Sequence, residues 1–581
     1  MIRRFPKLGK GLLLSVLAAF PSSIFAAPST SIVLISIDTL RADHLGCYGY
    51  RNIRTPHLDS LAKGGTLFEQ IESPVPMTLP AHVSLLSSTY PYVHGVRENG
   101  EQVPPKILTL PAVLKADGYR TAAFIGGYVL DARFGMNNGF DVYDSPFHLR
   151  PDPGEEPPEV KRSADGVLNA AAQWIKTNSG HPFFAFIHLY DVHQPYSHGS
   201  YDGEISYVDE AIGRFQQSLA GQKVLGDAIV ILTADHGESL GEHGEETHGY
   251  FIYQGTLRVP LVIHWPAGAS KYAARVKGPA SIIDLAPALL EFLGIPVPAQ
   301  FQGHNLMRLL GPQPSANEPI YAESLYAHDH MGCSPLRTVR IGRYKFIEAP
   351  KPELYDLEAD PGETQNRYGQ DHDVALRLRA RLASFQQSDR QSAQNPTNPE
   401  VISRLRSLGY LSGRASGGNS GADPKDRLQV YLRYGRAIRY ANTGHLPEAI
   451  REFQAVLEDN NENTSARFYL AVCYYRSRSL EDAVKALNAT LATSPDYPPA
   501  EELLGTIALI KEDFVGARQH FVHLAAIDPA NFNAHYNLGI LAMRDGRTEE
   551  ALRELRQALA INPKDESARK TLDELQKKAS N

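Results

Sequence analysis

Acidic, hydroxyl and imidazole side chains stand where predicted strands end or a predicted helix begins, and together they have the chemistry of a metal site. Asp38 ends the apolar run SIVLISID, and Asp235 and His236 close the run DAIVILTADHG. Because open α/β sheets place their ligand crevice at the carboxyl ends of strands, we expect these three side chains to bind one divalent ion. Two carboxylates and an imidazole suit Mn²⁺ or Zn²⁺ better than Ca²⁺, which prefers oxygen ligands alone. For Asp38 by itself, capping of the next helix is the alternative.

Thr78 opens the stretch TLPAHVSLLSS, whose Pro80 fits the first turn of a helix. Its hydroxyl therefore stands at a helix N-terminus, where unpaired N–H groups and the helix dipole favour an anion. A bound metal ion lowers the pKa of such a hydroxyl, which then becomes both a metal ligand and a nucleophile. The alternative is a threonine that only caps the helix.

Two histidines complete this candidate site. His193 lies in HLYDVHQPY and His248 in GEHGEETHGY, and either imidazole can donate to an ester oxygen or protonate a leaving group. His188 and His243, in the same stretches, are interpreted as structural hydrogen-bonding residues. The predicted catalytic residues are Thr78, His193 and His248, and the predicted metal ligands are Asp38, Thr78, Asp235 and His236.

The elements that would position these residues are short β-branched runs that alternate with helical stretches from Ser31 onward. Continuous apolar runs of this kind are typical of strands buried on both faces, so we predict a parallel or mixed sheet between helices. Near residues 321–366, shorter runs such as RTVRIGRYKFIEA, separated by turn residues, indicate a small antiparallel subdomain. The predicted class is α/β, with a catalytic domain over residues 31–390.

A different pattern begins behind the stretch SGRASGGNSGADP, residues 412–424, whose small and polar residues predict a flexible linker. In residues 425–578, four sets of positions recur in steps of 34 residues. The sets are Ala449, Ala483, Ala517 and Ala551; Pro495, Pro529 and Pro563; Leu470, Leu504 and Leu538; and Ala471, Gly505 and Gly539. This period resembles the tetratricopeptide repeat, an all-α solenoid, rather than an irregular helical bundle.

Tetratricopeptide repeats stack into a superhelix with a concave groove, so we expect residues 425–578 to bind a protein or peptide and to take no part in the chemistry. Because a linker of Gly and Ser transmits no rigid contact, the repeats are also expected to be separable from the catalytic domain.

The N-terminus and the composition indicate the cellular context. Residues 1–27 carry cations, then the apolar run LLLSVLAAF, then small residues, which is typical of a secretory signal peptide. The protein is therefore expected in the periplasm or outside the cell; an uncleaved segment would instead tether it to the outer face of the inner membrane. The net charge of -7 argues against nucleic acid as a ligand, and the three cysteines have no metal-ligand spacing.

Taken together, the strings SIDTLRADHLGCYG, TPHLDSLAKGG, TLPAHVSLLSSTYPYVHGV, YDVHQPY, TADHGESLGEHG, VPLVIHWP and ELYDLEADPGETQN resemble the sulfatase family of the alkaline phosphatase superfamily, over about residues 31–390. The resemblance implies an alkaline phosphatase-like α/β/α sandwich. It also implies that Asp38 and Asp235 are the metal aspartates and that Thr78 is the nucleophile. His193 and His248 would then be the histidines that contact the substrate. His236 stands where sulfatases often have Asn.

The departures from the family pattern bear on the chemistry. Sulfatases use CxPxR, whose cysteine is converted to formylglycine, whereas this chain has TLPAH from Thr78 to His82. A formylglycine hydrate releases sulfate without attack of water on sulfur, which threonine cannot do. A phosphothreonine, by contrast, can be resolved by attack at phosphorus or passed to an acceptor. The lysine of the family is missing as well, since the matching stretch reads FIGGYVLD.

One metal ion is predicted rather than two. Two-metal members of the superfamily carry a DxxxH pair, but Pro195 stands four residues after Asp191. A second ion is the alternative. Glu323 and His330, in AESLYAHDHMG, are candidates to reach the site from the smaller subdomain.

The sequence thus predicts an exported, metal-dependent hydrolase or transferase that acts on phosphate esters through Thr78, as a phosphatase, phosphodiesterase or phosphotransferase. Two alternatives are kept open. One is a true sulfuric ester hydrolase. The other is a catalytically inactive scaffold for the repeats, against which the joint presence of Asp38, Thr78, Asp235 and His236 argues.

Overall fold

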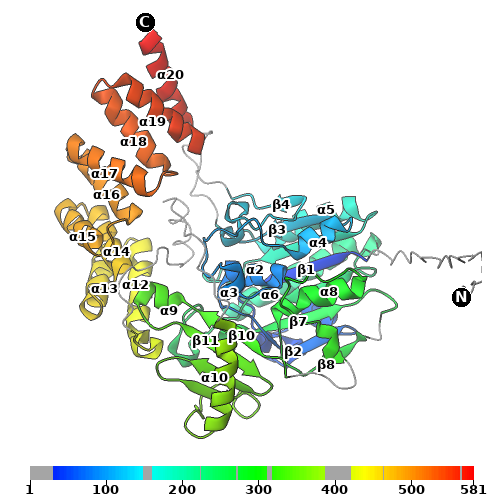
Figure 1. The fold of residues 1–581 in the computed structure, drawn as a ribbon. Helices are drawn as coiled ribbons and strands as arrows, with labels where there is room; N and C mark the ends of the chain where they lie inside the picture. Colours follow the sequence, from blue (N-terminus) through cyan, green and yellow to red (C-terminus); the bar gives the residue numbers. More distant parts are fainter. Residues whose placement is uncertain are drawn as a thin grey trace, which may run out of the picture.

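The computed structural model describes residues 30–147, 160–222, 224–269, 272–310, 317–386, 421–461, 463–562 and 565–580. The predicted signal segment, residues 1–27, and residues 412–420 of the predicted linker lie outside these ranges. Figure 1 shows a domain with a central sheet, followed by a curved stack of helices, which confirms the predicted fold class. No helix in the described ranges combines the length and the apolar character that a membrane crossing requires.

The catalytic domain is organised around a nine-stranded mixed sheet in the order β4-β3-β5-β1-β6-β7-β2-β8, with β9 paired to β2. Its strands are β1 (Ile32–Ile37), β2 (Thr66–Glu72), β3 (Arg120–Ile125), β4 (Val142–Asp144), β5 (Phe183–Leu189), β6 (Ile229–Thr233), β7 (Arg258–His264), β8 (Ala274–Val276) and β9 (Ala280–Ser281). β1 lies between β5 and β6 and is parallel to both. Every residue of these three strands is buried, as their continuous apolar runs predict.

Helices cover both faces of this sheet (Figure 1). They are α1 (Pro56–Ala62), α2 (Thr78–Ser87), α3 (Pro91–His94), α4 (Leu110–Ala116), α5 (Ala164–Asn178), α6 (Tyr201–Leu219), α7 (Gln254–Leu257) and α8 (Leu285–Leu293). α1 and α5 pack against α6 in one layer, whereas α2 packs with α4 and α8 in the other. In α5, Ser163 caps the helix, and buried apolar residues at helical spacing from Val167 to Ile175 form its sheet-facing side.

A smaller antiparallel sheet, in the order β10-β11-β12-β13, forms the predicted subdomain. Its elements are β10 (Ile320–Ser324), α9 (Tyr326–Met331), β11 (Leu336–Ile341), β12 (Tyr344–Glu348), β13 (Glu353–Asp356) and α10 (His372–Gln386). Lys345 of β12 is fully buried, pairs with Glu363 at 2.7 Å and donates to the Ile252 carbonyl at 2.7 Å. Because a buried charge requires such partners, these contacts hold the subdomain against the segment that follows His248.

The C-terminal helices form successive antiparallel pairs, as the 34-residue period predicts. They are α12 (Leu428–Asn442), α13 (Leu446–Asp459), α14 (Thr464–Arg476), α15 (Leu480–Thr493), α16 (Pro498–Ile510), α17 (Phe514–Ile527), α18 (Phe532–Arg544), α19 (Thr548–Ile561) and α20 (Glu566–Ser580). The small residues of the period lie where paired helices touch. A Cβ added at Gly505 would come within 2.8 Å of the Phe521 ring, and one at Gly539 within 2.8 Å of Leu555.

The end of the predicted linker is not flexible, because residues 421–424 pack on the catalytic domain. Ala422 forms a β-bridge with Cys333, and the buried Asp423 carboxylate accepts the Lys351 N–H at 2.8 Å. The first helices of the repeats then continue the hydrophobic core of the catalytic domain. The expectation that the linker transmits no rigid contact is therefore wrong at this end, since its side chains find partners that are remote in the sequence.

Candidate active site

β1 and β6 lie side by side and in parallel, so the residues that follow them meet at one edge of the sheet. Asp38 follows β1 directly, and Asp235 and His236 follow β6 after Ala234. One ligand atom from each of the two carboxylates and the imidazole lies within 4.8 Å of the others, and the three residues are fully buried. Within the described part of the chain, no other group of three such side chains is arranged to hold a metal ion.

Thr78 is the first residue of α2, and its side chain reaches the same cluster. Its hydroxyl oxygen is 3.4 Å from His236 Nε2 and also interacts with the Asp38 carboxylate. α2 is buried along its whole length, so the position of this hydroxyl is closely constrained. The positive end of the helix dipole lies at the same point, where it favours an anion.

Burial disfavours the charged forms of the two carboxylates in the cluster. It raises the pKa of Asp38 to about 7, against the opposing effect of the His236 imidazole. The pKa of Asp235 is also raised, first by burial and then by the negative charge of Asp38. Asp38 Oδ1 and Asp235 Oδ2 have no hydrogen-bond partner among the described residues. Two buried carboxylates with unmatched oxygens fit a divalent cation, which supplies the opposite charge.

Two histidines that the sequence did not assign to the site lie directly behind it. His188, near the end of β5, has its Nε2 3.1 Å from Asp38 Oδ2. His82 of α2 is hydrogen bonded to Ser36 Oγ at 2.9 Å and to the Thr78 carbonyl at 2.8 Å. Burial lowers the pKa of His188 to about 4 and that of His82 to about 3, so both rings are neutral at neutral pH. They orient the Asp38 carboxylate and the start of α2.

The two predicted catalytic histidines stand beside the cluster on different loops. The His248 ring centroid lies 4.5 Å from that of His236 and 5.2 Å from that of His193. His193 stacks on Tyr190 at 4.6 Å, and its Nδ1 donates to the Gln194 carbonyl at 2.6 Å. Burial lowers the pKa of His248 to about 4 and that of His193 well below its ordinary value. Because the neutral His193 ring uses its one N–H for the Gln194 carbonyl, its Nε2 can only accept a hydrogen bond, whereas His248 can donate one to an ester oxygen.

Two more polar residues near the cluster were missed in the sequence. Glu238 Oε1 is 3.1 Å from His248 Nδ1, and burial raises the pKa of this carboxyl to about 8. Asn99 Oδ1 accepts the N–H of Leu79, the residue after Thr78, at 2.8 Å. Its Nδ2 has no partner among the described residues and is suited to an ester oxygen. Glu238 could have been found from its place in TADHGES, whereas the Asn99 stretch carries no such signal.

Glu323 and His330 hold a neighbouring loop rather than a metal ion. Glu323 forms an ion pair with Arg97 at 2.7 Å, and His330 Nε2 is 2.8 Å from the Glu98 carboxylate. Both contacts brace the loop that carries Asn99, and neither residue belongs to the metal cluster.

The other sequence expectations concern residues outside the cluster. Asp191 accepts the N–H of Ala164 at 3.2 Å and so caps α5. In the stretch that lacks the lysine of the family, Gly127 lies against the Tyr190 ring. A Cβ added at Gly127 would lie 2.6 Å from this ring. His243 stacks on a tyrosine ring at 3.7 Å, as expected for a structural residue.

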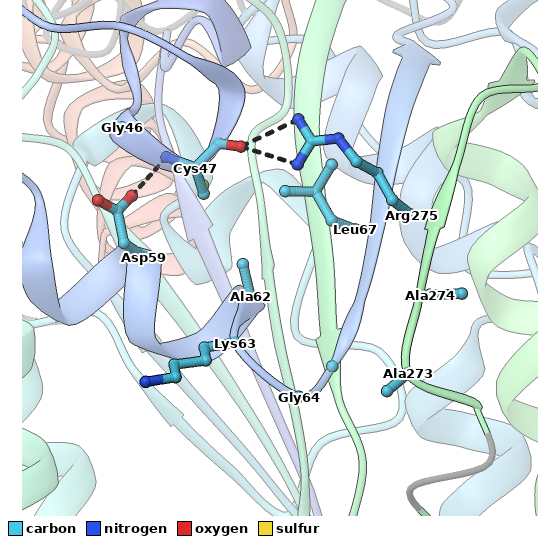
Figure 2. Close-up of a pocket in the computed structure, with 11 residues that line it drawn as sticks. Gly46, Cys47, Asp59, Ala62, Lys63, Gly64, Leu67, Ala273, Ala274 and Arg275 are labelled. Carbon is cyan, nitrogen blue, oxygen red and sulfur yellow. Dashed lines mark hydrogen bonds between the residues drawn. The ribbon is translucent and has the colours of Figure 1, made fainter.

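A hollow of about 460 Å³ lies elsewhere, beside β2 and β8 (Figure 2). Arg275 there donates to the Cys47 carbonyl at 3.1 Å and forms an ion pair with Glu69 at 2.6 Å. Burial raises the pKa of the Cys47 thiol to about 12. Because the Arg275 guanidinium is paired and the Cys47 thiol is neutral, this hollow is a weaker candidate for an active site than the cluster of Asp38, Asp235 and His236 beside Thr78.

Family comparisons divide the chain at the same place as the structure. Residues 30–295 match the family described as Sulfatase, and residues 241–388 match the C-terminal region of N-sulphoglucosamine sulphohydrolase. Residues 434–498 and 508–576 each match a tetratricopeptide-repeat family.

Individual proteins show the same relationship. The ulvan-active sulfatase of Formosa agariphila is 25% identical over 397 residues, which cover 58% of this chain and 77% of that protein. Arylsulfatase A of Homo sapiens is 24% identical over 440 residues, covering 61% and 86%. The phosphonate monoester hydrolase of Agrobacterium radiobacter shares the fold, with a TM-score of 0.52 and 21% identity over 62% of this chain and 95% of that one. The chain is therefore a sulfatase-family hydrolase that carries tetratricopeptide repeats behind its catalytic domain.

Proposed function

We propose that this hydrolase cleaves phosphate esters through Thr78, or passes their phosphoryl group to an acceptor. The observation that carries the proposal is the Thr78 hydroxyl, 3.4 Å from His236 Nε2, at the position where sulfatases have a convertible cysteine. A threonine cannot form the aldehyde hydrate through which sulfatases release sulfate. It can form a phosphoester that water or an alcohol then cleaves at phosphorus.

We also propose that the metal is one Mn²⁺ or Zn²⁺ ion rather than Ca²⁺. Asp38, Asp235 and His236 would hold it, with Thr78 as a further ligand, and the imidazole is the reason for the preference. A bound ion of this kind lowers the pKa of an adjacent hydroxyl and neutralises charge on ester oxygens.

Cleavage takes two displacements at phosphorus. Thr78 Oγ1 gives its proton to solvent and attacks phosphorus, so that a Thr78–phosphorus bond forms and the bond to the leaving alcohol breaks. His248 donates a hydrogen bond to the ester, and the leaving oxygen takes up a proton from solvent. Water or an acceptor alcohol then attacks phosphorus, and His193, whose Nε2 carries no proton, accepts the proton that the attacking oxygen loses and passes it to solvent. The bond to Thr78 breaks, Thr78 Oγ1 takes back a proton from solvent, and phosphate or the phosphorylated acceptor leaves.

A phosphate ester is expected to be turned over with a higher kcat/KM than the sulfate ester of the same phenol. The measurement uses a phosphate monoester, a phosphate diester and the sulfate ester, each with metal added and with metal chelated. An added alcohol that becomes phosphorylated identifies transfer. A higher kcat/KM for the sulfate ester would contradict the proposal and favour a sulfuric ester hydrolase, the activity in the names of the curated relatives. No turnover of any ester would favour an inactive scaffold.

His236→Asn is expected to shift the metal preference toward Ca²⁺, because it replaces the imidazole with an oxygen ligand. Elemental analysis of protein purified from mixed Mn²⁺, Zn²⁺ and Ca²⁺ measures the change. His445→Asn is the matched control, since His445 pairs with Thr443 inside the repeats at 2.9 Å. One equivalent of Ca²⁺ in the wild-type protein would contradict the proposed preference for Mn²⁺ or Zn²⁺.

We further propose that the protein acts after export, in the periplasm or outside the cell, and that the groove of its repeats binds a protein or peptide. The cations and apolar run of residues 1–27 support export, and the repeat architecture supports the partner class. Cell fractionation of the full-length chain tests the location, and recovery in the cytoplasm alone excludes it.

A further inference from the structure

The loop 239–250 follows the metal ligand His236 and carries His248. Its only regular element is one short 3-10 turn, Glu242–Gly244. A backbone bond from the Ser239 N–H to the Thr247 carbonyl, 2.7 Å long, closes the loop on itself. Internal bonds of this kind define the shape of a loop, but its position relative to the metal cluster depends on what packs against it from outside.

The first helix of the repeats, α12, packs against this loop. The Tyr431 ring stacks on Tyr250, with centroids 4.3 Å apart and planes at 20°. The Tyr431 hydroxyl is 3.3 Å from Oγ1 of Thr247, the residue before His248. Tyr250 is itself fully buried, and its hydroxyl donates to the Pro424 carbonyl at 2.8 Å. Both sides of His248 are therefore held by the segment that begins the repeats.

Further contacts extend this interface. Leu428 of α12 packs so closely on Gly244 that an added Cβ there would lie 2.8 Å from the leucine Cδ2. Asn463, just before α14, donates from Nδ2 to the His330 carbonyl of α9 at 3.3 Å. The first two helix pairs thus contact loop 239–250 and α9, whereas the later pairs extend away from the catalytic domain (Figure 1).

We infer that the first repeat is part of the catalytic unit and that Tyr431 is a positioning residue for His248. The inference rests on the proposed contact of His248 with the ester. An imidazole that acts in the transition state must be held close to its productive position. A shift of loop 239–250 should therefore lower kcat more than it raises KM. The repeats therefore both offer a groove and complete the enzyme.

Kinetics of full-length variants test the role of Tyr431. Tyr431→Ala is expected to lower kcat for a phosphate ester by about tenfold to a hundredfold, with a change in KM of less than about threefold. Tyr431→Phe keeps the stacked ring and loses one long hydrogen bond, so kcat should stay within about twofold of wild type. Tyr536→Ala is the matched control, because its ring stacks on Phe532 within the repeats, at 5.7 Å, and both constants should be unchanged.

A double-mutant cycle separates positioning from general destabilisation. In the His248→Ala background, Tyr431→Ala should have no further effect on kcat, because the imidazole that Tyr431 positions is gone. Amide hydrogen exchange adds a readout that needs no substrate. Tyr431→Ala should raise exchange in peptides that cover loop 239–250, and Tyr536→Ala should not.

Wild-type kcat in Tyr431→Ala, with unchanged exchange in loop 239–250, would overturn the inference. So would losses that add in the double variant. The failure of the proposed function looks different, since the wild-type protein would then not cleave phosphate esters. In that case the cycle is run on whichever ester is cleaved, and if none is, the exchange measurement alone decides whether Tyr431 holds the loop.

Discussion

Replacement of Thr78 by alanine is expected to lower kcat/KM for a phosphate ester by at least about a thousandfold, or about 4 kcal/mol in transition-state stabilisation. The Thr78 hydroxyl interacts with Asp38 and lies 3.4 Å from His236 Nε2. Its removal therefore takes away the proposed nucleophile and leaves the other groups of the cluster in place. Steady-state kinetics of the full-length protein measure the loss.

Two variants in the same helix control this experiment. Thr78→Ser keeps the hydroxyl and should retain kcat/KM within about tenfold of wild type. Ser84→Ala also removes a buried hydroxyl from α2, one that is hydrogen bonded to His94 at 2.9 Å, and should keep its activity. Thermal unfolding checks that each variant is folded. Near wild-type turnover in Thr78→Ala would show that the nucleophile lies elsewhere.

Removal of the metal is expected to have the second largest effect. Dialysis against a chelator should lower kcat/KM by at least about a hundredfold, and Mn²⁺ or Zn²⁺ should restore it. The physical reason is that Asp38 and Asp235 are fully buried and that one oxygen of each accepts no hydrogen bond from the described residues, so the cluster requires a cation. Elemental analysis should find one ion per chain, and the ion should raise the unfolding temperature because it binds the folded state.

A pair of aspartate variants makes the metal test specific. Asp235→Asn should lose both the ion and the activity. Asp209→Asn is the matched control, because Asp209 is a buried carboxylate outside the cluster that accepts the Leu58 N–H at 2.8 Å, a bond that asparagine keeps. Full turnover by the metal-free protein, or two ions per chain, is incompatible with a single-ion site.

Much of the fold follows from local patterns. The apolar runs that end at Asp38 and Asp235 predicted fully buried parallel strands, and adjacent parallel strands bring the residues after them together. The repeat period was readable because it has a packing cause: a side chain at Gly505 would collide with Phe521 of the paired helix. Such signals depend on neighbours within one strand or one helix pair, and a sequence displays them directly.

The position of the repeats was not predictable in the same way. The stretch of small and polar residues indicated a flexible connection, yet Asp423 at its end is buried against the catalytic domain. Tyr431 stacks on Tyr250, from which it is separated by 181 positions in the sequence, and no periodicity encodes such a contact between two surfaces. Stacking of two tyrosines depends on how whole domains meet, and neither ring has a distinctive sequence context.

The support around the candidate site shows the same limit. His188 was interpreted as structural, and its Nε2 lies 3.1 Å from the carboxylate of Asp38, a proposed metal ligand. Asn99 comes from a loop between short helices and meets the start of α2 through a single hydrogen bond to Leu79. Residues that orient a site have no spacing requirement along the chain, whereas the ligands at strand ends do.

Trapping the covalent intermediate tests the nucleophile and the substrate class together. The full-length, metal-loaded protein is mixed with a phosphate monoester, quenched in acid during turnover and digested, and its peptides are weighed and sequenced by mass spectrometry. We expect one phosphoryl group on the peptide that contains TLPAHVSLLSS, located at Thr78, and none in Thr78→Ala. A phosphoryl group on another residue, or no adduct in a protein that cleaves the ester with burst kinetics, would contradict catalysis through Thr78.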